Sequence, residues 1–276
     1  MRVALGVSYL GQHYQGWQSQ RSGLTIQDRL EAALCQFADR PVRTLCAGRT
    51  DTGVHALTQV VHFDVDLDRA PFSWVRGTNR FLPPDIAVQW AQPVPDAFHC
   101  RASAQSRRYR YLLSQSPVRP SLEAGRVGWS MRSLDPEAMR AAAALLVGRH
   151  DFTSFRASAC QARSPVKHLR RIDIRRTDAS AAMNADGSGV MWQFEFEADA
   201  FLHHMIRNIM GCLVRVGSAE APPAWMGDLL AARSRTLAAP TFSAAGLYFV
   251  GPQYAALWQL PASVTQAQAA GYDASA

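Results

Sequence analysis

The order of the expected secondary-structure elements constrains the fold of this chain most strongly, because it is the same in both halves. In the first half, an alternating strand over residues 3–9 precedes a helix that begins at Thr25, with Asp28 placed in a capping pattern. In the second half, an alternating strand at residues 108–111 precedes a helix that begins at Asp135. Each helix is followed by further strands. This order predicts an α+β protein in which helices pack on a mostly antiparallel, mixed sheet.

Two similar halves, residues 1–104 and 105–261, are therefore expected around a central cleft. The polar, Gly- and Ser-rich stretch 178–189 predicts a hairpin insertion, and the tail 262–276 is expected to be disordered. The remaining expected elements are strands at 42–47, 59–65, 86–90, 190–198 and 247–250, and helices at 135–148 and 201–216.

Charge is distributed unevenly along the chain. Residues 104–176 carry 15 basic and 5 acidic groups, a net of +10, whereas residues 1–103 have a net of +1 and residues 177–276 a net of −4. A concentrated basic block indicates a polyanion partner, since phosphate neutralisation dominates nucleic-acid affinity. All but one of the 29 basic residues are Arg, which suits phosphate contacts and base stacking, although an arginine-favouring genome would give the same count.

Several protein classes are not indicated. The longest apolar run, residues 141–147, is far shorter than the roughly 20 residues of a membrane span. The five cysteines are scattered without a CxxC pair, which argues against a disulfide framework or a zinc knuckle and favours a reducing cytoplasm. A P-loop, a GxGxxG fingerprint and a GxSxG elbow are all missing, so a nucleotide cofactor is not indicated.

The segment AGRTDTGVHA at residues 47–56 is the main candidate for chemistry. Its single acid, Asp51, lies between Arg49 and Gly53, and strand-like stretches flank the segment on both sides. Glycine permits backbone conformations closed to other residues, and loops on a rigid scaffold often hold catalytic groups. The segment therefore predicts an active-site loop. A solvated turn whose Asp caps a short helix is the alternative interpretation.

The expected helix at 201–216 holds a second candidate. Arg207 and Gly211 are four residues apart on one face, so the glycine is expected to leave space around the guanidinium. An arginine that emerges from an apolar helix needs a carboxylate or phosphate partner, although a surface salt bridge is the alternative. His203 and His204 are adjacent and cannot share one helix face as metal ligands, so they are interpreted as structural, and no metal site is predicted.

Several long motifs occur in a familiar order. They are YQGWQ at 14–18, AGRTDTGVHA at 47–56, FLPPDIAV at 81–88, FHCRASA at 98–104, RRYRY at 107–111, DFTSFR at 151–156, FLHHMIRNIMG at 201–211 and GLYFV at 246–250. In these motifs, over nearly its whole length to about Tyr254, the chain resembles the tRNA pseudouridine synthase A (TruA) family. The resemblance implies the pseudouridine synthase fold and conversion of uridine to pseudouridine in the anticodon arm of tRNA, at positions 38, 39 and 40. It also implies a homodimer in which one tRNA bridges both subunits. A cytoplasmic protein with no cofactor, metal or membrane partner is expected from the sequence features above.

The same resemblance assigns roles to individual residues. Asp51 corresponds to the catalytic aspartate, Arg207 to the basic residue that pairs with it, and Tyr109 to the active-site tyrosine, with Tyr111 as the alternative. Arg49 would help to hold the target nucleotide out of its stack. Further RNA contacts are implied for Phe98, His99, Arg101, Cys160, Gln161 and Arg163.

Three positions depart from the family pattern. Leu10 stands where the family usually has Asp, which weakens the expectation that the first loop contacts RNA. Thr52 and Cys100 each replace a common Ala, and these exchanges between small residues are expected to leave the chemistry unchanged.

The implied chemistry agrees with these residue types. The C1′–N1 bond must break, the uracil must rotate, and C1′ must rejoin at C5, with no group lost and no redox change. One ionised carboxylate can serve as nucleophile at C1′ or C6, or as base at C2′. Tyr109 can stack on the uracil and offer its hydroxyl for proton transfer at C5. The target base must also leave its stack.

Three other functions stay open at this stage. The basic block would suit a non-catalytic RNA-binding or RNA-chaperone module equally well. A synthase for other RNA positions would differ only in its RNA-facing loops. A metal-dependent nuclease is not supported by any cluster of carboxylates or histidines in the sequence.

Overall fold

The computed structural model describes residues 1–177 and 189–265. The predicted insertion at 178–189 thus lies outside the described residues except for Gly189, as does the tail beyond Thr265. The strands are β1 (Arg2–Tyr9), β2 (Leu45–Cys46), β3 (His55–Asp64), β4 (Ile86–Val94), β5 (Ala104–Gln115), β6 (Gly128–Ser130), β7 (Gly148–Asp151), β8 (Val166–Thr177), β9 (Val190–Ala198) and β10 (Leu247–Tyr254). The helices are α1 (Ile26–Ala38), α2 (Pro71–Asn79), α3 (Pro136–Ala144), α4 (Met205–Gly217), α5 (Trp225–Ala232) and α6 (Ala262–Thr265), with short 3-10 turns at 11–13, 153–155, 235–237 and 256–258.

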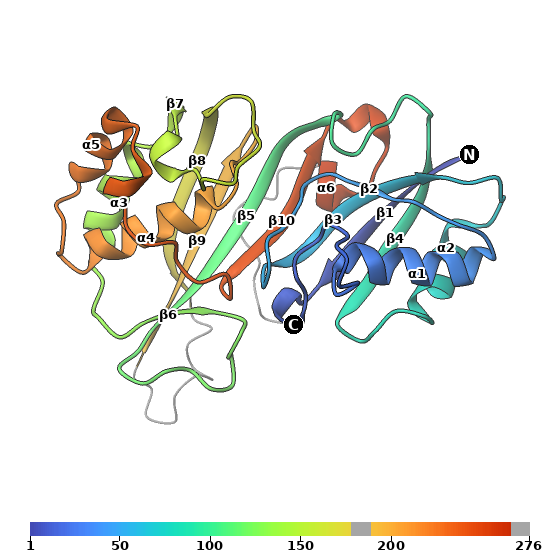
Figure 1. The fold of residues 1–276 in the computed structure, drawn as a ribbon, viewed down its shortest axis with the longest axis horizontal. Coiled ribbons are helices and arrows are strands. Elements are labelled where there is room, and N and C mark those ends of the chain that lie inside the picture. Colours follow the sequence, from blue (N-terminus) through green and yellow to red (C-terminus); the bar gives the residue numbers. More distant parts are fainter. Residues whose placement is uncertain (178–188, 266–276) are drawn as a thin grey trace.

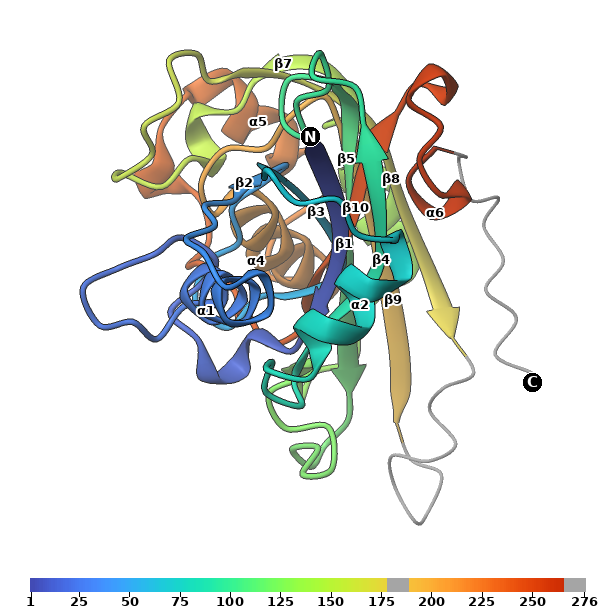
Figure 2. The same cartoon turned by 90° about the vertical axis from the view of Figure 1, so that its right-hand side faces the viewer.

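One mixed sheet runs through the molecule in the order β4-β1-β3-β10-β5-β9-β8-β7, with β2 beside β3 and β6 beside β5. Neighbouring strands are antiparallel except for the β10–β3 and β5–β6 pairs, which are parallel. The predicted α+β class with a mostly antiparallel mixed sheet is therefore confirmed. Figure 2 shows α1, α4 and α5 on one side of this sheet and α6 on the other.

The last strand occupies the centre of the sheet. β10 returns from the end of the chain to lie between β3 and β5 (Figure 1). Its register places Phe249 opposite Ala56 on one side and Tyr109 on the other. The end of the 47–56 segment is thereby brought one strand away from the RRYRY motif. The division into halves at residues 104 and 105 stays a prediction.

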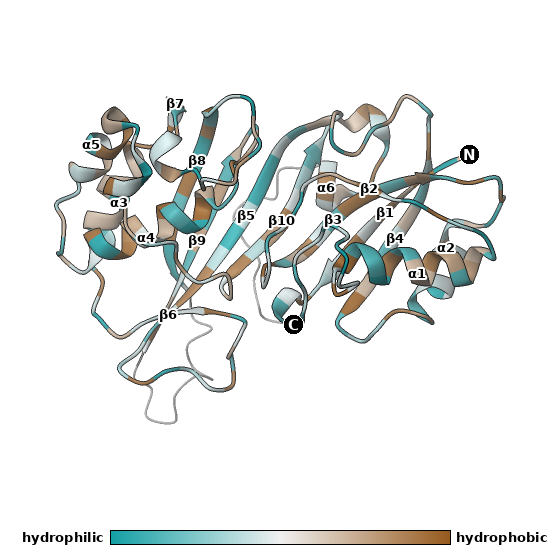
Figure 3. Ribbon diagram, in the orientation of Figure 1, coloured by the Kyte–Doolittle hydropathy of each residue, from teal (hydrophilic) through white to brown (hydrophobic). Residues whose placement is uncertain are grey.

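Apolar packing also joins the two halves. One core cluster fills the space between the sheet and α3, α4 and α5, and a second lies between the sheet and α1. Tyr109 packs against both clusters. Figure 3 shows hydrophobic and hydrophilic residues interleaved along strands and helices, as expected for elements with one buried face.

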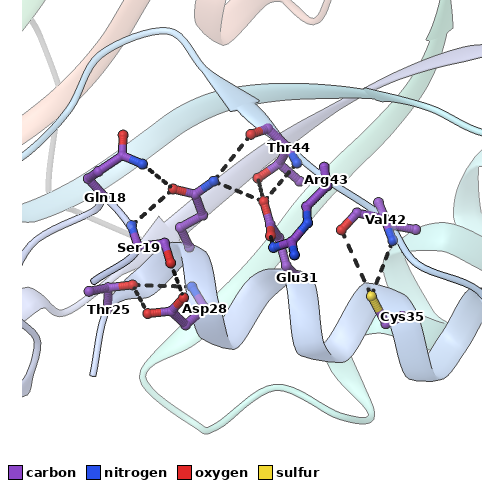
Figure 4. A network of polar contacts seen from close by, with 10 residues as sticks. Gln18, Ser19, Thr25, Asp28, Glu31, Cys35, Val42, Arg43 and Thr44 are labelled. Carbon is purple, nitrogen blue, oxygen red and sulfur yellow. Dashed lines mark hydrogen bonds and ion pairs between the residues drawn. The ribbon is translucent and has the colours of Figure 1, made fainter. Parts of the chain in front are cut away.

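Helix α1 begins as its sequence predicts. It also forms hydrogen bonds to the residues that precede the 47–56 segment. The Thr25 hydroxyl accepts a hydrogen bond from the Asp28 amide. The buried Glu31 carboxylate accepts hydrogen bonds from the Thr44 amide at 2.8 Å and from the Arg43 guanidinium at 2.9 Å (Figure 4). Because a buried carboxylate is costly unless it is satisfied, this network fixes the approach to β2.

Three boundaries differ from the predictions. The helix predicted to close at Gly148 ends at Ala144, since Gly148 has a φ of 119° and begins β7. The strand predicted at 42–47 is regular only at Leu45–Cys46. Residues 262–265, assigned to the disordered tail, instead form α6, where Val264 is fully buried.

The helix predicted at 201–216 begins only at Met205, because His204 takes a left-handed conformation with φ of 60°. His203 and His204 thus lie in the loop before α4. Among the residues that the structure describes, no helix has both the length and the apolar character needed to span a membrane.

Candidate active site

A cleft of about 710 Å³ lies between segments that are far apart in the sequence. Its walls come from the segment 15–20, the loop 47–54, β5, the segment 159–162 and the segment 200–207. This volume is within the range of pockets that hold small ligands, and it is sufficient for a nucleotide. Asp51, Tyr109 and Arg207 all line it, so the structure brings the three predicted catalytic candidates together.

The loop that carries Asp51 is held from behind by the N-terminal segment. The Thr50 carbonyl accepts a hydrogen bond from the Trp17 amide at 3.0 Å, and its hydroxyl lies 2.8 Å from the Tyr9 hydroxyl. Gly16 has a φ of 83°, and a Cβ there would lie 2.6 Å from the Thr50 carbonyl oxygen. Only glycine permits this approach, so the loop is fixed by backbone contacts.

The loop turns sharply into a strand. Gly53 has a φ of 80°, as its position in the segment predicts, and the Val54 amide donates to the Asp51 carbonyl at 3.1 Å. β3 begins at His55, so Asp51 precedes a strand. The alternative of a turn whose Asp caps a helix is therefore wrong.

Three nitrogen-bearing side chains face the Asp51 carboxylate. His203 Nε2 lies 3.4 Å from Oδ1, His204 Nε2 lies 3.6 Å from Oδ2, and Arg207 Nη1 lies 3.8 Å from Oδ2. The Asp51 side chain is 23% exposed and that of Arg207 17%. A partly buried carboxylate is stabilised by a cationic neighbour, and the Arg207 guanidinium is one.

Arg207 is aimed by a second contact. Its Nε donates to the Phe242 carbonyl at 2.9 Å, while the Phe242 amide donates to the Arg207 carbonyl at 3.1 Å. The segment before β10 thus runs along α4 and orients the guanidinium. The alternative of an exposed surface salt bridge does not describe this half-buried pair.

Glycine is required at position 211 for a different reason from the predicted one. A Cβ at Gly211 would lie 2.3 Å from the Pro240 carbonyl oxygen. The glycine therefore admits the backbone of the segment that orients Arg207, and it does not clear space for the guanidinium itself.

Tyr109 is the tyrosine of the cleft. Its ring lies edge-on to Phe201 at a centroid distance of 5.1 Å and tilted against Phe249 at 4.9 Å. Burial, reinforced by the charge of Asp51, raises the pKa of Tyr109 well above its usual range, so its hydroxyl is neutral at physiological pH. Tyr111 is fully buried and donates its hydroxyl to the Ser243 carbonyl at 2.9 Å. The geometry thus favours Tyr109 over Tyr111.

The remaining predicted contacts divide into two groups. Arg49, Arg101, Cys160 and Gln161 line the cleft, whereas His99 and Arg163 lie outside its lining. Phe98 was expected to contact RNA, but its side chain does not face the cleft. Its ring is fully buried against Tyr254 and Trp258, so its side chain belongs to the core.

Sequence reasoning missed the histidine pair. His203 and His204 were interpreted as structural residues on a helix, but their rings lie side by side in the cleft with centroids 4.0 Å apart. The signal available in the sequence was their place directly before the arginine helix. Ligand atoms of Asp51, His203 and His204 lie within 4.8 Å of one another, as do those of His62, His99 and Cys100, so both groups could geometrically hold a metal ion.

An aspartate, a tyrosine and an arginine from three separate elements thus meet in one cleft at the centre of a mixed sheet. Ionisable and aromatic side chains that converge in one cleft are typical of an enzyme active site.

Comparison with known proteins identifies its family. The family model described as tRNA pseudouridine synthase matches residues 6–101 and 142–255, and the chain belongs to this family. A protein of Variovorax paradoxus (strain S110) named tRNA pseudouridine synthase A is 70% identical over 274 residues, which cover 99% of each chain. Proteins of the same name from Paracidovorax citrulli and Acidovorax ebreus are each 67% identical, over 95% of this chain and 96% of theirs.

Among solved structures, an unknown protein from Galdieria sulphuraria is 13% identical, with a TM-score of 0.22, over 78% of this chain and 90% of that chain. The similarity is too weak to support the fold assignment.

The close packing at Gly211 leads to a stability prediction. We expect Gly211→Ala to lower the free energy of unfolding by about 1–3 kcal/mol, because the new methyl group must displace the Pro240 backbone. The matched control is Gly227→Ala in α5, where the new Cβ would meet Leu145 at an ordinary 3.8 Å. This control should be neutral or stabilising by up to about 1 kcal/mol. Chemical denaturation measures both, and equal effects of the two substitutions would contradict the prediction.

Proposed function

We propose that this chain converts uridine to pseudouridine in the anticodon arm of tRNA, at positions 38, 39 and 40, with Asp51 as the catalytic carboxylate and no metal or organic cofactor. The observation that carries the proposal is the Asp51 carboxylate, set inside the cleft and faced by His203, His204 and Arg207. Membership of the tRNA pseudouridine synthase family supports the reaction and the tRNA substrate. The finer choice of the anticodon arm rests on the TruA resemblance.

The reaction balances without any outside reagent. The C1′–N1 bond breaks, a C1′–C5 bond forms, C5 loses a proton and N1 gains one. Asp51 acts as nucleophile at C1′ or C6, or as base at C2′, and each of these routes uses one negatively charged carboxylate oxygen. Because no group is lost and no electrons are transferred, neither a Lewis acid nor a redox cofactor is needed.

Arg207 stabilises the charge that Asp51 requires. At a separation near 4 Å, two opposite unit charges attract by about 4 kcal/mol at an effective dielectric constant of 20. Since Arg207 is also bound to the Phe242 carbonyl, it holds this position before substrate arrives. Such prior orientation spares the enzyme the cost of arranging the charges during the reaction.

We assign Tyr109 to the contact with the target base. Its neutral hydroxyl and its ring line the cleft beside Asp51, next to the aromatic rings of Phe201 and Phe249. A flipped uracil can stack on an aromatic surface of this kind, and the hydroxyl can take part in proton transfer at C5.

Positive charge around the cleft suits an RNA backbone. Arg49, Arg101 and Arg107 line it, and Arg49 is exposed. We assign Arg49 to the space that the target base vacates, where its guanidinium can also contact phosphate. We extend the proposal to a cytoplasmic homodimer, because the TruA resemblance implies two subunits. Each subunit would consist of the halves 1–104 and 105–261.

The first test replaces the carboxylate with its closest isostere. Asp51→Asn is expected to abolish pseudouridine formation while tRNA affinity stays within about tenfold, or 1.4 kcal/mol, because the substitution keeps shape and removes only charge. A carbodiimide-based pseudouridine map of tRNA measures turnover, and filter binding measures affinity. Retained turnover in the variant would disprove the role of Asp51.

The same map separates the alternatives. Wild-type protein that binds tRNA but leaves the map unchanged would be an RNA-binding module. Marks outside the anticodon arm would indicate a synthase for other positions. EDTA-sensitive cleavage of the tRNA, with no pseudouridine, would indicate a metal-dependent nuclease.

The second test concerns base extrusion. Arg49→Ala is expected to lose turnover on folded tRNA, because the vacated space is no longer filled and the base returns to its stack. The loss should be smaller on a stem-loop whose target uridine is mismatched, since a mismatched base costs less to flip. Initial rates on both substrates measure the difference. Undiminished activity on folded tRNA would remove this role from Arg49.

A further inference from the structure

The two histidines beside Asp51 owe their placement to one backbone conformation. Adjacent side chains point to opposite faces of a strand, and are about 100° apart on a helix. His204 instead takes a left-handed conformation, with φ of 60° and ψ of 4°, and both rings lie side by side. Non-glycine residues hold this conformation only where the surroundings enforce it, and such sites are often functional.

The surroundings of His204 do enforce it. The Asn208 amide donates to the His204 carbonyl at 2.9 Å, and the Ala157 amide donates to the His203 carbonyl at 3.0 Å. Leu202 and Met205, on either side of the pair, are buried in the core. Backbone hydrogen bonds and the buried side chains of Leu202 and Met205 thus hold the turn. The two imidazoles line the cleft.

The partners of Asp51 are distributed unequally between its two oxygens. In the ion-pair contacts of the described residues, the atoms nearest to His204 and Arg207 are both Oδ2, at 3.6 and 3.8 Å, whereas the atom nearest to His203 is Oδ1, at 3.4 Å. His203 is also the most exposed of the three, at 38% against 28% for His204 and 17% for Arg207. All three separations exceed a normal hydrogen bond, so the neighbours of each oxygen act on it through charge and dipole at short range.

We propose that His204 is a positioning residue that, with Arg207, fixes Oδ2 of Asp51 and so presents Oδ1 as the reacting oxygen, while His203 contacts the incoming nucleotide beside Oδ1. For a given Cα–Cβ rotamer, the carboxylate rotates only about the Cβ–Cγ bond, so two groups that hold one oxygen determine where the other points. Burial lowers the pKa of His204, which keeps its ring neutral at physiological pH. A neutral imidazole that carries its proton on Nε2 can donate to Oδ2 without neutralising the carboxylate.

The experiment separates the side chain of His204 from its backbone. Glutamine places an amide N–H near the position of Nε2, whereas asparagine tolerates the left-handed conformation but is too short to reach Oδ2. In single-turnover reactions with enzyme in excess, His204→Gln should react within about tenfold of wild type. His204→Asn and His204→Ala should lower the maximal rate by about a hundredfold, with half-saturating enzyme concentration within about threefold.

His203→Ala should behave in the opposite way. It is expected to raise the half-saturating concentration about tenfold and to leave the maximal rate within about threefold, since it removes a contact to bound nucleotide. His150→Gln on β7, outside the cleft lining, is the matched control and should resemble wild type. Thermal unfolding of each variant reports any loss of fold.

The outcomes decide the proposal. If His204→Asn equals His204→Gln, or if His204→Ala changes only the half-saturating concentration, the positioning role is overturned. Should His204→Ala fail to fold, the Gln and Asn variants still decide. The inference rests on the proposed function, and Asp51→Asn tests that function separately. Turnover without the carboxylate would reject the function, whereas an inactive Asp51→Asn beside a fully active His204→Ala would reject only the inference.

Discussion

The arrangement of the cleft depends on one ion pair, in which the Arg207 guanidinium lies 3.8 Å from the Asp51 carboxylate. Withdrawing a carboxylate from solvent is costly unless a partner compensates it, and Arg207, from a distant part of the chain, is that partner for Asp51. Its loop is rigid because Thr50 is bound to Trp17 and Tyr9, and Arg207 is rigid because Phe242 binds it. Both partners are therefore positioned before any RNA binds. This is the condition under which electrostatic stabilisation contributes most to catalysis.

The insertion of β10 makes this meeting possible. A strand from the end of the chain pairs with β3 on one side and β5 on the other, so the loop that carries Asp51 and the strand that carries Tyr109 become near neighbours. The segment that leads into β10 also passes Gly211 and delivers the Phe242 carbonyl to Arg207. β10 and the segment before it thus join β3 to β5 and orient the Arg207 guanidinium.

Features set by local sequence could be predicted, and those set by distant contacts could not. The Thr25 cap, the strand at 190–198 and the turn at Gly53 follow from neighbouring residues, and the structure confirms them. The burial of Phe98 and the role of Gly211 depend on Trp258 and Pro240, far away in sequence, and both were interpreted wrongly. The histidine pair was missed because the left-handed conformation of His204 delays the start of α4 to Met205. No periodicity in the sequence reveals such a conformation.

The most direct measurement is a crystal structure of the Asp51→Asn variant bound to a tRNA anticodon stem-loop. The account predicts a uridine that has left its stack, with its base beside Tyr109 and its C1′, C2′ or C6 atom about 3–3.5 Å from the side chain at position 51. A target uridine that stays stacked in the RNA, with the cleft empty and Arg207 turned towards solvent, would contradict it.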